Sequence, residues 1–191
     1  MPPILELPPT YREVKHLVVT EGNRLLWLNF LALIPLAASI VLLTIWWRLV
    51  VQLRGTIPGG SIPWWIGLPV VMLVLFIHEL IHAAAIRLVG HQPRIGAKLH
   101  KGVLYATADG AYFRRGEFIL VALAPLMVIS LAGMLLMMTL PDALGYWISL
   151  AVVLNAGGAI GDLWMTVVVL QHPATALIRD EEDGIRVFES V

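Results

Sequence analysis

Residues 64–89 read WWIGLPVVMLVLFIHELIHAAAIRLV, an apolar run that carries three ionisable side chains close together. A helix needs about 20 apolar residues to cross the core of a bilayer. A charge at the middle of such a helix costs about 2.5–3.5 kcal/mol, so ionisable groups there usually have a function. The run therefore predicts a membrane-spanning helix that contains a functional site.

The three ionisable side chains belong to an HExxH motif, His78-Glu79-Leu80-Ile81-His82. Residues four positions apart lie on one face of a helix, so the two imidazoles can hold one metal ion. Glu79 stands beside them and can reach a water molecule on that metal. Zinc suits imidazole and carboxylate ligands, and a catalytic site has three protein ligands and an open position. The alternative is a polar cluster that only joins helices.

The third ligand must come from another segment, because Ala85 and Leu88 stand where the metzincin motif needs glycine and histidine. Asp162 is the one carboxylate inside the last apolar run, and at that depth it needs a cation. At about 1.5 Å per residue, the two histidines lie roughly 12–18 Å and Asp162 roughly 14 Å from their helix ends on the same side. The sequence therefore predicts that Asp162 completes the site. The competing candidates are His91, His100, Asp109 and His172.

The other apolar residues also gather in long blocks. Hydrophobic residues make up 59% of the 191 residues and charged residues 14%, whereas soluble domains are about 25% charged. Pro35 predicts a kink in the first block, and residues 48–63 are expected to form a loop. The prediction is an all-α membrane domain over residues 1–191, with four transmembrane helices at about 25–47, 64–89, 118–140 and 144–170.

The charge and the amino-acid composition argue against several kinds of partner and site. The net charge is zero, which gives no sign of a nucleic-acid partner. The absence of cysteine excludes disulfides and thiolate metal ligands. The first residues do not have the pattern of a cleaved signal peptide. The expected partners are the lipid bilayer and a membrane protein or peptide substrate, and nothing indicates an oligomeric state.

The polar segments predict small β elements. Residues 91–117 alternate in polarity and contain turn signals at 100–102 and 108–110, which favours a hairpin or small sheet at the membrane surface. A second hairpin is expected from ALIR at 176–179 and IRVF at 185–188, and a short strand at His16–Val19. The acidic run Asp180–Asp183 is interpreted as a solvated turn rather than a cation site.

Basic residues predict the orientation of the chain in the membrane. With four spans, the N-terminus, residues 91–117 and the C-terminus share one side, and they hold ten of the thirteen Lys and Arg residues. Arg48 and Arg54 lie on the other side. The positive-inside rule then places both termini and residues 91–117 in the cytoplasm, with the chain in the cell membrane.

Asn155 lies seven residues before Asp162, so both occupy roughly one face of the last helix. Two roles are open for its amide: a hydrogen bond to a substrate carbonyl or oxyanion, or a hydrogen bond between helices. Between the two residues, the glycines of GGAIG at 157–161 favour close helix packing or a local break in the helix.

The combination of HELIHAAA at 78–85 and NAGGAIGDLW at 155–164 resembles the site-2 protease class of intramembrane zinc metalloproteases. It resembles more closely a family of small bacterial membrane proteins described as "putative zincin peptidases". The resemblance implies that His78, His82 and Asp162 bind zinc, that Glu79 is the catalytic base and that Asn155 orients the substrate. The sequence departs from the better-studied site-2 enzymes by having glycine at 158 and leucine at 163, where their pattern has proline and glycine.

The functional hypothesis is zinc-dependent hydrolysis of peptide bonds in a membrane-embedded or membrane-proximal substrate, with Glu79 activating the zinc-bound water. Two other hypotheses remain open. One is a membrane metal carrier or sensor without hydrolytic activity, and the other is an inactive scaffold that binds membrane partners. The presence of Glu79 favours the enzyme, because a carrier needs no base beside the open coordination position.

Overall fold

The computed structural model describes residues 3–19, 21–55, 63–98, 103–108, 110–140, 142–182 and 184–191. Most of these residues are helical. The helices are α1 (Arg24–Leu31), α2 (Leu33–Arg54), the short η1 (Trp64–Ile66), α3 (Gly67–Leu88), α4 (Arg115–Thr139), α5 (Asp142–Gly158) and α6 (Ile160–Leu170). The strands are β1 (Tyr11–Val18), β2 (Arg94–Lys98), β3 (Val103–Thr107), β4 (Phe113–Arg114), β5 (Leu177–Glu181) and β6 (Gly184–Ser190).

Three helical segments of the described chain are long and apolar enough to cross a membrane, by length and composition: Arg24–Arg54, Gly67–Leu88 and Arg115–Thr139. A fourth segment qualifies if the bent pair Leu144–Gly158 and Ile160–Leu170 is counted as one span. The four apolar blocks of the sequence therefore correspond to three or four candidate spans.

The first candidate span differs from its prediction at both its bend and its end. The helix breaks at Ala32, three residues before Pro35, because proline disrupts the preceding helical turn. The expected loop at 48–63 is wrong for its first part, since α2 continues to Arg54 and buries Val50, and residues 56–62 lie outside the described residues. The helix ends where Gly55 adopts a left-handed conformation with φ 66°, a typical glycine C-cap.

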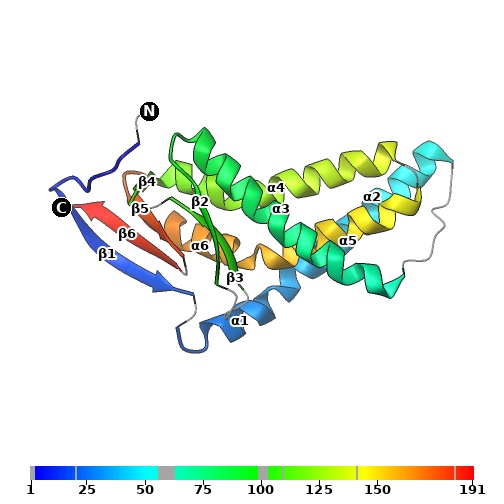
Figure 1. Ribbon diagram of the computed structural model, residues 1–191, viewed down its shortest axis with the longest axis horizontal. Coiled ribbons are helices and arrows are strands. Elements are labelled where there is room, and N and C mark those ends of the chain that lie inside the picture. The colour runs from blue at the N-terminus through cyan, green and yellow to red at the C-terminus, as the bar shows by residue number, and fades with distance from the viewer. Residues whose placement is uncertain are drawn as a thin grey trace.

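The strands form two separate sheets at one end of the molecule (Figure 1). β2 and β3 pair as an antiparallel hairpin, as the sequence predicts. The predicted β5–β6 hairpin also forms, but it belongs to a four-stranded sheet in the order β1-β6-β5-β4. The strand expected at His16–Val19 is longer, from Tyr11 to Val18, because β6 offers a partner along this whole length.

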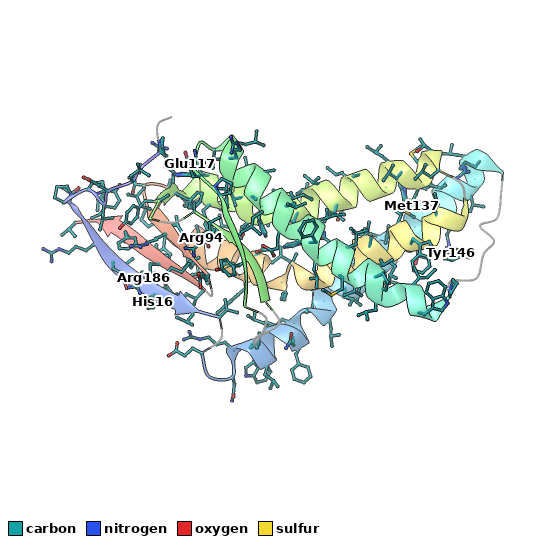
Figure 2. The ribbon with its side chains drawn as sticks, in the orientation of Figure 1. His16, Arg94, Glu117, Met137, Tyr146 and Arg186 are labelled. Carbon is teal, nitrogen blue, oxygen red and sulfur yellow. The ribbon has the colours of Figure 1, made fainter. Side chains whose placement is uncertain are left out.

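The main hydrophobic core joins the four-stranded sheet to the ends of α3, α4 and α6. Its fully buried side chains include Ile86, Phe113, Val169 and Ile178. A second, smaller core of Leu43, Met137 and Val152 lies among α2, α4 and α5. Figure 2 shows His16, Arg94, Glu117 and Arg186 at the sheet end, and Met137 and Tyr146 at the opposite end. The charged residues and the histidine labelled in Figure 2 therefore lie at the end of the molecule that carries the sheets.

Candidate metal centre

Side chains from two helices converge where α3 passes α6. His78 and His82 of α3 lie one helical turn apart, and their Nε2 atoms are 3.1 Å from each other. The Asp162 Oδ2 of α6 lies 3.1 Å from the His78 Nε2 and 3.5 Å from the His82 Nε2. One ligand atom from each of the three residues lies within 4.8 Å of the others, close enough to share one metal ion. The structure thus brings together the three residues that the sequence predicted as metal ligands.

The His82 ring is oriented by the backbone of α4. Its Nδ1 lies 3.0 Å from the carbonyl oxygen of Val121, which can only accept a hydrogen bond. Nδ1–H must therefore donate, which leaves the Nε2 lone pair facing the centre. Val121 O is available because the residue four positions later, Pro125, has no N–H to give to it. Pro125 therefore leaves the Val121 carbonyl free to accept the hydrogen bond that fixes the tautomer of His82.

The His78 ring is oriented through Asn155. The His78 Nδ1 lies 2.9 Å from the Asn155 Oδ1, and the Asn155 Nδ2 donates to the carbonyl oxygen of Pro125 at 3.2 Å. Because the amide nitrogen donates to a carbonyl, the amide oxygen accepts from His78 Nδ1–H. Asn155 is only 2% exposed. Of the two roles left open by the sequence, the structure places Asn155 in a hydrogen bond between helices, behind His78.

Asp162 reaches the centre because the last helical segment is bent. α5 and α6 meet at an angle of 43°, and the break falls at Ala159 within the glycine-rich stretch. Asp162 lies in the first turn of α6, where the positive end of the helix dipole stabilises a carboxylate. The local break that the glycines allow therefore places a carboxylate opposite the two histidines.

Glu79 lies beside the cluster but is not one of its three members. Its side chain is half-buried and within electrostatic reach of both histidines and Asp162. Its carboxylate also interacts with the backbone N–H of Ala106 in β3. Glu79 thus stands between the metal cluster and the β2–β3 hairpin.

Asp180 is a further carboxylate near the centre that the sequence did not single out. It was expected in a solvated turn, but it belongs to β5, where Thr107 Oγ1 donates to its backbone oxygen at 3.2 Å. Burial raises the pKa of its carboxyl to about 7, and the negative charges of Asp162 and Glu79 act in the same direction. No local pattern distinguishes it from the other acidic residues of the run, because only the packing of β5 against β3 buries it.

The competing ligand candidates lie elsewhere. His91 is buried against Phe113, with its ring 4.5 Å away, and burial lowers the pKa of the imidazole. His172 is hydrogen-bonded to Glu189 at 2.7 Å. His100 and Asp109 lie outside the described residues. Among the residues that the structure describes, the cluster of His78, His82 and Asp162 is the one group suited to hold a metal ion.

The comparisons with known proteins are consistent with a zinc site at this position. Residues 71–177 match the model of a protein family described as "Putative zincin peptidase". No curated protein and no solved structure matches the chain. The matched range contains Glu79, Asn155 and all three residues of the cluster, and a zincin uses zinc, which suits two imidazoles and a carboxylate. Since the match covers more than half of the chain, the protein belongs to this zincin peptidase family.

Proposed function

We propose that the protein is an intramembrane zinc peptidase of the site-2 type, which hydrolyses peptide bonds of membrane-embedded or membrane-proximal substrates. The observation that carries the proposal is the convergence of the His78 Nε2, the His82 Nε2 and the Asp162 Oδ2, with Glu79 alongside. These groups come from apolar helices with the length and composition of membrane spans.

The proposed membrane position rests on the surface of the helices. Large apolar side chains are exposed along α2, α3 and α4, including Leu42, Leu73, Phe76 and Leu135. Contiguous apolar surface of this extent on a soluble monomer would be unusual. The sheets lie at one end of the molecule together with the first and last described residues (Figure 1), and that end carries most of the basic residues. By the positive-inside rule we place this end in the cytoplasm, with the chain in the cell membrane.

We assign zinc to His78, His82 and Asp162. Each histidine has its Nδ1 engaged by an acceptor, so both Nε2 lone pairs are free to coordinate. Three protein ligands leave one position of a tetrahedral site open, as catalytic zinc sites require. When bound, zinc supplies Lewis acidity, which activates water near neutral pH and polarises a carbonyl group.

Glu79 is assigned the role of general base. It lies near the three ligands without belonging to their cluster, so its carboxylate is free to accept a proton from the attacking water. The same carboxyl can then deliver that proton to the amine that leaves when the peptide bond breaks. The Ala106 N–H can hold the carboxylate in place between these two steps.

The β2–β3 hairpin is a candidate binding surface for the substrate backbone. The two strands form a sheet of their own, so in the described part of the chain each has an edge without a neighbouring strand. The Ala106 N–H interacts with Glu79, which indicates that the free edge of β3 faces the centre. A helical substrate hides its carbonyl groups and must unwind before cleavage. An unwound segment paired along β3 would pass directly beside Glu79.

The proposal is tested with purified protein in liposomes and a set of labelled single-span peptides. We expect about one zinc ion per chain by elemental analysis, and cleavage products whose new ends lie in or next to the apolar segment by mass spectrometry. Removal of zinc with a chelator should abolish cleavage, and addition of zinc should restore it. Bound zinc that crosses the liposome membrane without any cleavage would favour the carrier. A chain that binds no zinc even after loading would favour the scaffold.

The proline of α4 gives a second test. In Pro125→Ala the new backbone N–H can bond to Val121 O and compete with the His82 ring. We expect zinc affinity to fall about 10–100-fold, the usual effect of losing a hydrogen bond behind a metal ligand. Competition with a fluorescent chelator measures this change. Pro35→Ala is the matched control, since Pro35 also interrupts a long helix but lies outside the centre. Equal losses in the two variants, or none in either, would contradict the role given to Pro125.

A further inference from the structure

A groove of about 530 Å³ lies between α2 and α5, at the end of the molecule far from the sheets. Its volume is in the range of small-molecule sites. Figure 2 shows Tyr146 at this end. The described residues that line the groove are Thr44, Trp47, Arg48, Val51 and Gln52 of α2, and Tyr146 of α5.

One wall of the groove is fixed by packing. The Trp47 indole N–H donates to Ser149 Oγ at 2.8 Å, which ties the ring to α5. Gly145 allows this approach, because a Cβ at this position would overlap the Trp47 ring. The rings of Trp47 and Tyr146 lie 6.5 Å apart and are tilted by 37°. The groove is therefore shaped by helix packing rather than by one freely rotating side chain.

The polar side of the groove contains a cation that has no partner in the described part of the chain. Arg48 is exposed and has no hydrogen-bond or ion-pair partner for its side chain among the described residues. Thr44, Arg48 and Gln52 follow one another at four-residue spacing, so they form one stripe along α2. Arg54, by contrast, donates from Nη1 to the carbonyl oxygens of Met137 and Leu140. Of these two arginines, Arg48 is the one available to an anion.

The groove also lies at the right depth for a lipid headgroup. Arg48 is six residues from the end of α2, or roughly 9 Å, and Tyr146 is four residues from the start of α5, or roughly 6 Å. The candidate span Arg24–Arg54 has 31 residues, or roughly 46 Å of helix, which is longer than the hydrocarbon core of about 30 Å, so its last turns extend beyond the acyl chains. Arg48 and Tyr146 therefore fall near the boundary between acyl chains and headgroups, where tryptophan and tyrosine also prefer to lie.

We propose that this groove binds one phospholipid through its phosphate. The Arg48 guanidinium donates to the phosphate in a bidentate manner, and the Gln52 amide donates alongside it. The glycerol and the first part of the acyl chains lie along Val51, Trp47 and Tyr146. The inference rests on the membrane position proposed above, and an unpaired cation at the membrane boundary is complementary to an anionic headgroup.

Native mass spectrometry of the full-length protein in detergent tests the proposal with three probes: dioleoylphosphatidylglycerol, dioleoylglycerol and glycerol 3-phosphate. The first has both phosphate and acyl chains, and each of the others lacks one of these parts. We expect one phosphatidylglycerol per chain, and binding at least about tenfold weaker for both other probes. Arg48→Gln should weaken phosphatidylglycerol binding about tenfold, and Arg48→Lys should weaken it less, since lysine retains the charge but not the bidentate geometry. Arg54→Gln is the matched control and should bind normally.

Four results would overturn the lipid assignment. Arg48→Gln could bind phosphatidylglycerol as tightly as the unchanged protein, or dioleoylglycerol could bind equally well. Glycerol 3-phosphate could also match the lipid, which would indicate a site for free phosphate. Displacement of the lipid by an acidic single-span peptide of higher affinity would instead assign the groove to a protein partner. Zinc content and peptide cleavage in detergent should be unchanged in Arg48→Gln. A failure of the lipid proposal can therefore be distinguished from a failure of the peptidase proposal.

Discussion

Replacement of Glu79 by glutamine is expected to lower peptide cleavage by about 10²–10⁴-fold while zinc remains at one ion per chain. The amide has nearly the same shape as the carboxylate, but it cannot take a proton from water. Because Glu79 is not one of the three residues that converge as ligands, its loss should not release the metal. Single-turnover cleavage of a labelled peptide and elemental analysis of the same sample measure both effects.

Glu21→Gln provides the control for this experiment. Glu21 is exposed and pairs with Arg24 at 2.8 Å, outside the metal centre, so cleavage should be unaffected. If Glu79→Gln retained full cleavage, the general-base assignment would be wrong. Asp180 would then be the next candidate, because it is the other carboxyl under the electrostatic influence of His82 and Asp162.

Replacement of Asp162 by asparagine is expected to have the second large effect, on zinc binding itself. The change removes the negative charge and one of the three ligands, but hardly changes the volume of the side chain. Loss of a hydrogen bond behind a ligand costs about 10–100-fold in affinity, so loss of a ligand should cost more than about 100-fold. Chelator competition measures this loss directly.

Thermal unfolding gives an independent measure of the same change. A ligand at 1,000 times its dissociation constant stabilises the folded state by about 4.1 kcal/mol. Saturating zinc should therefore raise the unfolding temperature of the unchanged protein, and this rise should disappear in Asp162→Asn. Asp180→Asn is the matched control, since it also removes a buried carboxyl near the centre but spares the ligands, and its zinc response should persist. A full zinc response in Asp162→Asn would mean that the third ligand comes from another residue.

The sequence predicted the helices and the convergence of the three candidate ligands from the patterns of the separate segments. Apolar blocks of about 20 residues marked the candidate spans, and the i, i+4 spacing of HExxH placed the two imidazoles on one face. Asp162 could be added because it is the one carboxylate inside the last apolar run, and the fixed rise per residue of a helix puts it at the level of the two histidines. The family match over residues 71–177 contains both histidines and Asp162, but it does not include the first candidate span, Arg24–Arg54.

Other features depend on contacts between residues far apart in the chain. The four-stranded sheet pairs β1 with β6. The residues of either strand do not indicate which other strand it will pair with. The burial of Asp180 depends on β5 packing beside β3, so its raised pKa could not be inferred from the acidic run. The role of Asn155 was left open because the direction of its side chain depends on where α4 lies.

By itself, the sequence determined which side chains could meet at one level along neighbouring apolar helices, because helical rise and periodicity are properties of each segment alone. Only the tertiary structure decided how these side chains are held. The Val121 carbonyl freed by Pro125 and the Asn155 amide fix the two histidine rings. Such bonds require α3, α4 and α5 to pack at particular rotations, which depend on the shapes of all three helices together.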